Sequence, residues 1–235
     1  MSRPKIQAVI FDMDGLLIDS ERVYTLVTNE LLAPYGKEVT WELKKGIMGR
    51  PGLDAARYLV EYTGIPLSPE EAMRLTERRQ EELFIKVEPM PGALKLVAHL
   101  ATHNVPLAIA TGSRQKNFVL KTSHLPELFT HFPKASIVTA DTEQVKKGKP
   151  HPDIFLYAAE TIGVFDANAR AKTLVFEDGI PGVKAARAAG MEVVWVPDDG
   201  LLAAASTEIV DASLTLKSLQ DFRPEDWGLP AYDVV

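Results

Sequence analysis

A short apolar segment near the start of the chain ends in two acidic residues and a glycine. Residues 8–11 read Ala-Val-Ile-Phe, and Asp12, Met13, Asp14 and Gly15 follow. An uninterrupted apolar run is typical of a strand covered on both faces, and open α/β sheets bind ligands beyond the carboxyl ends of such strands. The segment therefore predicts a buried strand that delivers Asp12 and Asp14 to the ligand-binding edge. Asp and Gly also form ordinary turns, and for this segment alone that alternative stays open.

Two later apolar segments end in the same way. Residues 106–110 lead into Thr111, Gly112 and Ser113, and residues 173–176 lead into Glu177, Asp178 and Gly179. A loop of hydroxyls and glycine that opens a helix offers backbone N–H groups to an anion. Between the two segments, Lys149 stands just before another predicted helix. Each side chain also has a plainer reading as a helix cap, a loop acid or a surface charge. Their occurrence together favours one functional site.

The order of these motifs resembles that of the haloacid dehalogenase superfamily, and in particular its phosphatase branch. The four motifs are Asp-Met-Asp-Gly, Ala-Thr-Gly-Ser, Gly-Lys-Pro and Phe-Glu-Asp-Gly, and the resemblance covers essentially the whole chain. Residues 11–21, 149–155, 175–178, 218–222 and 228–230 are similar to the subgroup that contains pseudouridine-5'-phosphatase and eukaryotic glycerol phosphatases. The resemblance implies an α/β fold: a Rossmann-like parallel-sheet core with an inserted helical cap domain.

The long interval between the first two predicted strands must contain this insertion. Roughly ninety residues separate the strands, far more than a simple crossover connection needs. Apolar residues recur at helical spacing in this interval, for example over residues 69–84. By resemblance, residues 18–87 form the cap, and residues 1–17 and 88–235 form the α/β catalytic core. After the cap, helices and strands alternate, and residues 193–196 predict a further strand.

Four acidic side chains around one phosphate would repel it and one another. At an effective dielectric constant near 20, two like charges about 4 Å apart repel by about 4 kcal/mol. One lysine cannot offset this repulsion, whereas a divalent cation can, and a site with only oxygen ligands suits Mg²⁺ better than zinc. We expect a Mg²⁺ site with Asp12 and Asp178 as carboxylate ligands and Glu177 as a direct or water-mediated ligand. The resemblance implies that Asp14 contributes its backbone carbonyl, which leaves its side chain free.

The resemblance implies different catalytic roles for the two acids of the first motif. Asp12 would attack phosphorus to form an aspartyl-phosphate, while Asp14 would protonate the leaving group and then activate water. Thr111 and the adjacent backbone N–H groups, those of Gly112 and Ser113, would hold the phosphoryl oxygens. The haloacid dehalogenases themselves lack the acid at the position of Asp14, since a halide leaves without a proton. The presence of this acid favours phosphoryl chemistry.

Three further side chains are candidate site residues. Lys149 would bind the phosphate, neutralise developing charge and restrain Asp12. Glu21 would meet hydroxyls of the substrate, although an acid in the first turn of a helix is equally ordinary. Arg50 stands in a glycine-rich loop of the cap, where it would contact the leaving group or remain a plain surface arginine.

Composition limits the partners and the location. The chain has 235 residues, a net charge of −6 and no cysteine. The negative charge argues against nucleic-acid binding, and the lack of cysteine excludes disulfides and thiol nucleophiles. No apolar stretch reaches the length of a membrane span, and the N-terminus lacks a secretory pattern. We expect a cytoplasmic monomer or weak homo-oligomer that binds a small phosphorylated metabolite, with no nucleic-acid or membrane partner.

Three functions fit this set of motifs. The first is a magnesium-dependent phosphatase acting on a small phosphorylated sugar, polyol or nucleotide, with pseudouridine 5'-phosphate as the best single substrate. The second is a β-phosphoglucomutase-like mutase, which would return the phosphoryl group to a sugar instead of water. The third is a non-enzymatic phospho-aspartate signalling module, although such modules have shorter chains and a different order of motifs.

Overall fold

A parallel β-sheet lies at the centre of the molecule. The computed structural model describes residues 5–47, 50, 52–204 and 210–233. Within them a six-stranded sheet has the order β3-β2-β1-β4-β5-β6, and every neighbouring pair is parallel. The strands are β1 (Ala8–Phe11), β2 (Leu107–Ala110), β3 (Ile137–Val138), β4 (Thr173–Glu177), β5 (Glu192–Trp195) and β6 (Leu214–Thr215). The predicted α/β class and the four predicted strands are confirmed, whereas β3 and β6 were not predicted.

The strand order places a crevice beside β1. The chain begins in the middle of the sheet, fills one side with β2 and β3, and then fills the other with β4, β5 and β6. Loops after β1 and β4 therefore lead to opposite sides of the sheet, and such a reversal opens a crevice at the carboxyl ends of the two strands. The first and fourth predicted motifs, which follow β1 and end β4, meet at this point.

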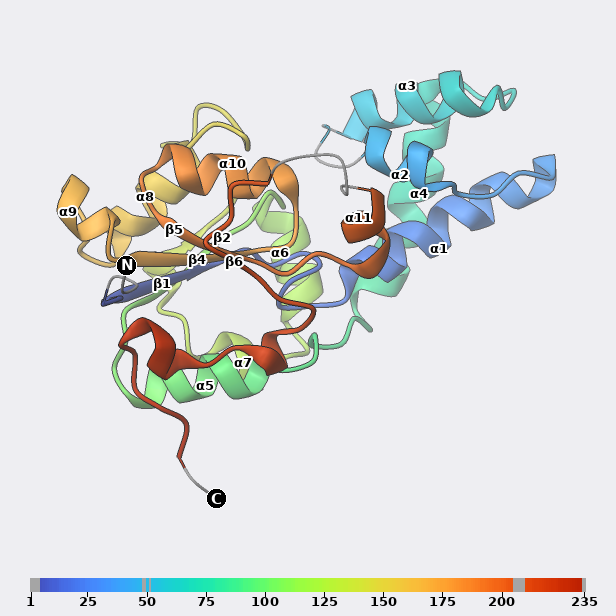
Figure 1. The fold of residues 1–235 in the computed structure, drawn as a ribbon. Helices are drawn as coiled ribbons and strands as arrows, with labels where there is room; N and C mark the ends of the chain where they lie inside the picture. Colours follow the sequence, from blue (N-terminus) through green and yellow to red (C-terminus); the bar gives the residue numbers. More distant parts are fainter. Residues whose placement is uncertain (1–4, 48–49, 51, 205–209, 234–235) are drawn as a thin grey trace.

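Helices cover both faces of the sheet (Figure 1). On one face lie α5 (Ala93–Thr102), α6 (Gln115–Thr122), α7 (Pro126–Phe129) and the C-terminal segment, and on the other lie α8 (Asp153–Thr161) and α10 (Ile180–Ala188). Val9 and Phe11 of β1 belong to the first apolar core, and Ala8 and Ile10 belong to the second. This alternation explains why the strand is apolar throughout, since both of its faces are buried.

Four helices between β1 and β2 form a separate group, which we call the cap (Figure 1). They are α1 (Ser20–Leu32), α2 (Trp41–Ile47), α3 (Gly52–Thr63) and α4 (Pro69–Phe84). Ser68 caps α4 by accepting the N–H of Glu71, and Pro69 fits the first turn because it needs no hydrogen-bond partner there. Leu32, Leu43 and Leu59 belong to an apolar cluster of the cap's own.

The two connections between the core and the cap run side by side. The N–H of Asp19 donates to the carbonyl of Glu88 at 2.9 Å, and the N–H of Met90 donates to the carbonyl of Leu17 at 2.9 Å. Ile18 and Pro89 pair as an antiparallel bridge between these bonds. Both connections therefore cross at one place, next to the loop that carries Asp12 and Asp14.

The cap also contacts α11 (Asp199–Ala204) of the core. Lys44 of α2 places its Nζ 3.2 Å from Asp198 Oδ2. The ring of Trp41 lies so close to Gly200 that a Cβ at that position would collide with it. A further short helix of the core is α9 (Ala167–Arg170). No helix in the described part of the chain is long and apolar enough to cross a membrane.

Candidate active site

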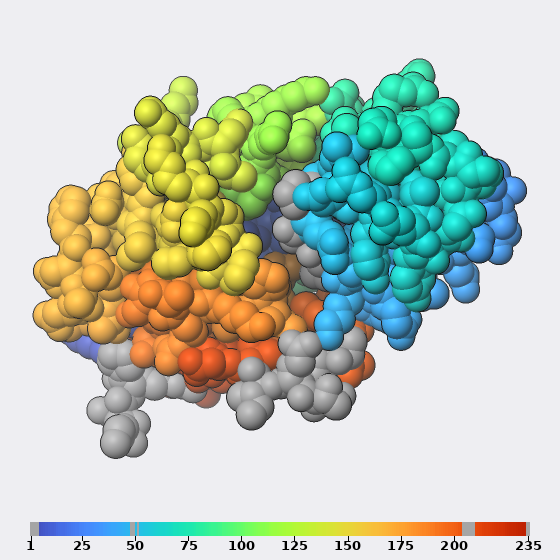
Figure 2. Space-filling model, turned by 90° about the horizontal axis from the view of Figure 1, so that it is seen from above, coloured from blue at the N-terminus to red at the C-terminus, as the bar shows by residue number. Residues whose placement is uncertain are grey.

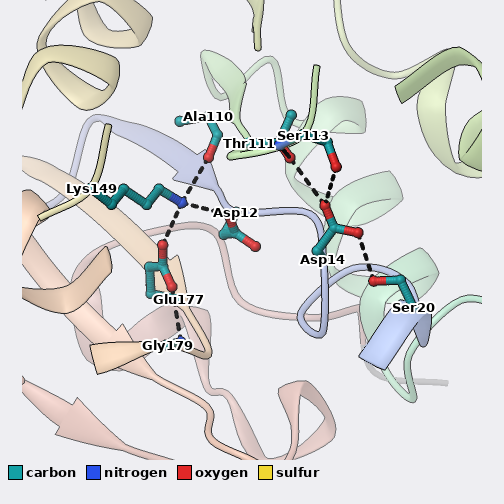
Figure 3. Close-up of polar contacts among 9 residues, drawn as sticks. All are labelled: Asp12, Asp14, Ser20, Ala110, Thr111, Ser113, Lys149, Glu177 and Gly179. Carbon is teal, nitrogen blue, oxygen red and sulfur yellow. Dashed lines mark hydrogen bonds and ion pairs between the residues drawn. The ribbon is translucent and has the colours of Figure 1, made fainter. Parts of the chain in front are cut away.

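The predicted site residues follow three neighbouring strands. Asp12 comes directly after β1, Thr111 follows β2, and Glu177 ends β4 with Asp178 next to it. Because β1 lies between β2 and β4 and all three are parallel, their carboxyl ends meet at one edge of the sheet. Figure 3 shows the side chains that gather there.

Lys149 joins the acids of two strands. Its Nζ lies 2.5 Å from Asp12 Oδ1 and 2.5 Å from Glu177 Oε1, and it also donates to the carbonyl of Ala110 at 3.1 Å. The three protons of the ammonium group therefore all have acceptors. Among the described residues only Lys149 donates a hydrogen bond to the Asp12 side chain, and it does so at Oδ1. Oδ2 is thus available to a phosphorus atom or a metal ion.

Asp12, Glu177 and Asp178 form an acidic cluster. Each offers a carboxylate oxygen, and these three atoms lie within 4.8 Å of one another. Burial raises the pKa of Asp12 to about 7; the charge of Lys149 opposes this rise, and Glu177 and Asp14 add to it. Burial and the charges of Glu177 and Asp12 hold the pKa of Asp178 well above its ordinary value.

This cluster fits Mg²⁺. Its donors are all carboxylate oxygens, the ligands that hard divalent cations prefer. Burial is the main cause of the raised pKa values of Asp12 and Asp178; neighbouring carboxylates raise both further, and Lys149 lowers them. A bound cation would supply the missing charge and would favour the ionised form of both acids.

Close backbone approach shapes the cluster. Gly15 has a φ of 79°, and a Cβ there would run into the carboxylate of Asp178. A Cβ at Gly182, in the first turn of α10, would run into the carboxylate of Glu177. Glycine at both positions therefore lets the loop after β1 and helix α10 close around the acids.

The side chain of Asp14 lies outside the acidic cluster and is held by four hydrogen bonds. Its Oδ1 accepts hydrogen bonds from Ser20 Oγ at 2.6 Å and Lys121 Nζ at 2.5 Å. Its Oδ2 accepts from Ser113 Oγ at 2.7 Å and Thr111 Oγ1 at 3.3 Å. Figure 3 shows Asp14 turned towards Ser113 and Ser20, while Asp12 is turned towards Lys149. The two acids of the first motif thus have different partners.

Lys121 is a site residue that the sequence analysis missed. It is fully buried in α6, and burial alone would disfavour its charge. Asp14 and Tyr24 outweigh this effect and raise the pKa of Lys121. Burial in turn disfavours the ionised form of Asp14, but the charge of Lys121 and the hydrogen bonds of its neighbours lower the pKa of this acid below its ordinary value. The buried face of α6 carries Phe118, Lys121 and Thr122, so two of its three residues are polar and no apolar periodicity points to Lys121.

The loop after β2 borders open space. Thr111 and Ser113 are buried, and the N–H of Ser113 donates to Thr111 Oγ1 at 3.0 Å. Gly112 is exposed, and a Cβ at this position would have no atom within 4 Å. The backbone at Gly112 therefore borders space that an anion can enter, while the hydroxyls of Thr111 and Ser113 on either side donate to Asp14.

A pocket of about 460 Å³ adjoins the acidic cluster and the cap. Asp178 and Glu21 line it together with Asn29, Lys44 and Leu201. Burial raises the pKa of Glu21, and the charge of Lys44, 3.4 Å from its carboxylate, opposes this rise. The structure thus brings Glu21 beside the acids, and Lys44 with it, which the sequence analysis did not select.

Arg50 packs against Tyr58 within the cap. Its side chain is exposed, and the guanidinium lies 4.7 Å from the centre of the Tyr58 ring. Residues 48, 49 and 51 of the same predicted glycine-rich loop are outside the described residues.

Figure 2 shows a hollow between the core, in yellow and orange, and the cap, in cyan and teal, with blue atoms of the N-terminal part of the chain at its floor.

Comparisons with known proteins agree with this geometry. Residues 6–190 match the family of haloacid dehalogenase-like hydrolases. The chain is 44% identical over 235 residues to "(DL)-glycerol-3-phosphatase 2" of Arabidopsis thaliana, across 98% of this chain and 95% of that protein. It is 43% identical over 228 residues to "Probable pseudouridine-5'-phosphatase" of Drosophila melanogaster, across 97% and 96% of the two chains.

A solved structure shows the same fold. The haloacid dehalogenase family hydrolase from Deinococcus radiodurans R1, with bound phosphate and sodium, matches with a TM-score of 0.77 at 25% identity. The match covers 97% of this chain and 99% of the other. The resemblance drawn from the four motifs is confirmed, and the chain belongs to the haloacid dehalogenase-like hydrolase family, within its phosphatases.

Proposed function

We propose that this phosphatase is Mg²⁺-dependent and hydrolyses pseudouridine 5'-phosphate through an aspartyl-phosphate on Asp12. The observation that carries the chemistry is the contact of Lys149 with both Asp12 and Glu177 at the crevice beside β1. This contact fixes one oxygen of Asp12 and leaves the other for attack. It also neutralises charge beside an atom that must approach an anionic phosphate.

Asp12, Asp178 and Glu177 are the residues that would hold Mg²⁺. The ion would supply positive charge that offsets the acids and the phosphate during the reaction. Glu177 is in addition held by Lys149 at Oε1 and by the N–H of Gly179 at Oε2. These two bonds keep its carboxylate fixed within the cluster.

The reaction would proceed in two displacements. In the first, Asp12 Oδ2 forms a bond to phosphorus, the bond from phosphorus to the ester oxygen breaks, and a proton on Asp14 passes to that oxygen. Since the ion pair with Lys121 lowers the pKa of Asp14 in the free protein, Asp14 would take up this proton when the anionic phosphate binds beside it. In the second, water attacks phosphorus, its proton passes to Asp14, and the bond between Asp12 and phosphorus breaks. Both acids return to their starting state, and the products are an alcohol and inorganic phosphate.

The pocket beside Asp178 supports a nucleotide as the substrate. Its volume of about 460 Å³ is within the range of sites that enclose metabolites, and a glycerol group would leave most of it empty. Glu21 can accept hydrogen bonds from ribose hydroxyls, and Asn29 and Lys44 can donate to carbonyl oxygens of a base. Arg50 would approach the leaving group from the cap. We further propose that the protein acts in the cytosol as a monomer or weak homo-oligomer.

The test is phosphate release with Mg²⁺ from a panel of small phosphate esters. The panel contains pseudouridine 5'-phosphate, uridine 5'-phosphate, glycerol 3-phosphate and β-glucose 1-phosphate. We expect kcat/KM for pseudouridine 5'-phosphate to exceed that for glycerol 3-phosphate about tenfold or more. Asp12→Asn should abolish turnover in a folded protein because it removes the nucleophile and a metal ligand together. A folded Asp12→Asn protein with a tenth of wild-type activity would refute the role of Asp12.

Two other results would change the proposed substrate or reaction. A preference for glycerol 3-phosphate would show that the pocket does not select the leaving group by size. Isomerisation of β-glucose 1-phosphate with little phosphate release would show a mutase. Glu21→Gln should lower kcat/KM for pseudouridine 5'-phosphate and spare acetyl phosphate, whereas Glu42→Gln, on an exposed acid of α2, should change neither.

A further inference from the structure

Lys121 is a buried lysine outside the four sequence motifs, and it lies between the core and the cap. Its side chain comes from the last turn of α6 and is 0% exposed. The ammonium group lies 4.4 Å from the centre of the Phe84 ring of α4 and 5.0 Å from that of the Tyr24 ring of α1. Two cap helices therefore cover a charge that the core supplies.

Each proton of this ammonium group has an acceptor. Lys121 Nζ lies 2.5 Å from Asp14 Oδ1, 3.0 Å from the Tyr24 hydroxyl and 3.0 Å from Ser113 Oγ. Asp14 is the one carboxylate within ion-pair distance of Lys121 in the described part of the chain. Because an isolated buried charge is strongly unfavourable, the two groups hold each other in place.

The two oxygens of Asp14 have different kinds of partner. Lys121 and Ser20 bind Oδ1, whereas the hydroxyls of Ser113 and Thr111 bind Oδ2. By the family resemblance, Thr111 and the loop backbone that follows it hold the phosphoryl oxygens, so a phosphate bound there competes with Asp14 for the hydroxyls of Thr111 and Ser113. Lys121 and Ser20 bind the other oxygen and can keep their hydrogen bonds. Phosphate binding would thus release Oδ2 and leave Oδ1 held.

We propose that Lys121 is a positioning residue that anchors Asp14 through Oδ1, so that Oδ2 faces the leaving group once phosphate occupies the hydroxyls of Thr111 and Ser113. The proposal rests on the acid–base role given to Asp14 under the proposed function. Since Ser20 and Tyr24 both belong to α1, the anchor also links the orientation of Asp14 to the position of the cap.

Lys121→Met, which keeps most of the side-chain volume and removes the charge, tests this role. With an alkyl phosphate, which needs a proton on its leaving group, kcat/KM should fall about ten- to a hundredfold. With an aryl phosphate the leaving group needs little protonation, so kcat/KM should stay within about threefold. For the aryl phosphate, the kcat and the KM of the variant should both fall, because the second step, hydrolysis of the phosphoenzyme, still needs Asp14.

Lys116→Met is the matched control. Lys116 is on the same helix and lies 2.5 Å from Glu81 of the cap, but its side chain is 77% exposed and does not contact Asp14. This variant should keep wild-type kinetics on both substrates. If Lys121→Met in a folded protein lowers alkyl and aryl kcat/KM equally, or changes neither, the positioning role is refuted.

Asp14→Asn separates this proposal from the proposed function. Alone it should show the alkyl-selective loss, and adding Lys121→Met should then cause little further loss, because the lysine acts through Asp14. Additive losses would refute the proposal. Equal losses on both substrates for Asp14→Asn alone would refute the acid–base role itself. Tyr24→Phe is the substitute test if Lys121→Met does not fold. This variant should lower kcat/KM for the alkyl phosphate more than for the aryl phosphate, but less than Lys121→Met would. Unchanged kinetics would refute the link to the cap.

Discussion

Replacing Lys149 with methionine should separate catalysis from metal binding. The change removes the ammonium group that lies 2.5 Å from both Asp12 and Glu177 and keeps a side chain of similar length. A hydrogen bond to a charged group is worth about 1.5–3 kcal/mol. If both bonds persist in the transition state, their loss raises the barrier by about 3–6 kcal/mol. At about 1.4 kcal/mol per tenfold change, kcat/KM should fall about 10²- to 10⁴-fold.

The affinity for Mg²⁺ should rise in the same variant, although its kcat/KM falls. Without Lys149 the carboxylates of Asp12, Glu177 and Asp178 have no cation among them, so the cluster attracts Mg²⁺ more strongly. Lys149→Met should therefore bind Mg²⁺ more tightly than the wild type, while Lys147→Met, an exposed residue of the same loop, should match the wild type in affinity and rate.

Two assays check this prediction. Phosphate release at saturating Mg²⁺ gives kcat/KM, and calorimetric titration with Mg²⁺ gives the affinity. A Lys149→Met protein that keeps more than a tenth of wild-type kcat/KM would refute the assigned contribution of the two hydrogen bonds. Weaker Mg²⁺ binding together with lost activity would instead show that Lys149 only holds the site together.

Two further predictions concern pH and the cap. Because burial raises the pKa of Asp12 from 3.8 to about 7, the metal-free protein should lose stability as the pH rises through this interval, and the raised pKa of Asp178 acts in the same direction. Mg²⁺ should then raise the melting temperature more at about pH 8 than at about pH 5, and equal shifts would contradict the sign of these pKa changes. Arg50→Ala should lower kcat/KM for the preferred substrate about tenfold or more and spare acetyl phosphate, whereas equal effects on the two substrates would exclude contact with the leaving group.

The sequence predicted those parts of the fold that short-range patterns determine. β1, β2, β4 and β5 are each built on a continuous apolar run because both of their faces are buried, and α4 has the predicted bounds of residues 69–84. β3 and β6 each have two residues, which is too short for any periodicity to appear. Their places at the two edges of the sheet follow from packing that the local sequence does not encode.

The site residues that stand at the ends of strands could be predicted from the sequence. Asp12, Thr111 and Glu177 each follow or end an apolar run, and the parallel sheet then brings them together. The surroundings of Asp14 were not predictable in this way, because its partner Lys121 stands in a helix, where a lysine ordinarily reaches solvent. Only the packing of α1 and α4 over α6 makes this lysine an internal charge.

The paired connections at Ile18 and Pro89 bear on how this architecture can diversify. Because the chain leaves the core and returns to it at one hydrogen-bonded bridge, the two ends of the inserted segment are neighbours. An insertion with adjacent ends can be lengthened, shortened or exchanged without moving the strands on either side. New substrate ranges can therefore evolve, or be engineered, by replacing the insert while the acids at the strand ends stay unchanged. A chimaera that joins another helical insert at this bridge should fold and keep activity on acetyl phosphate.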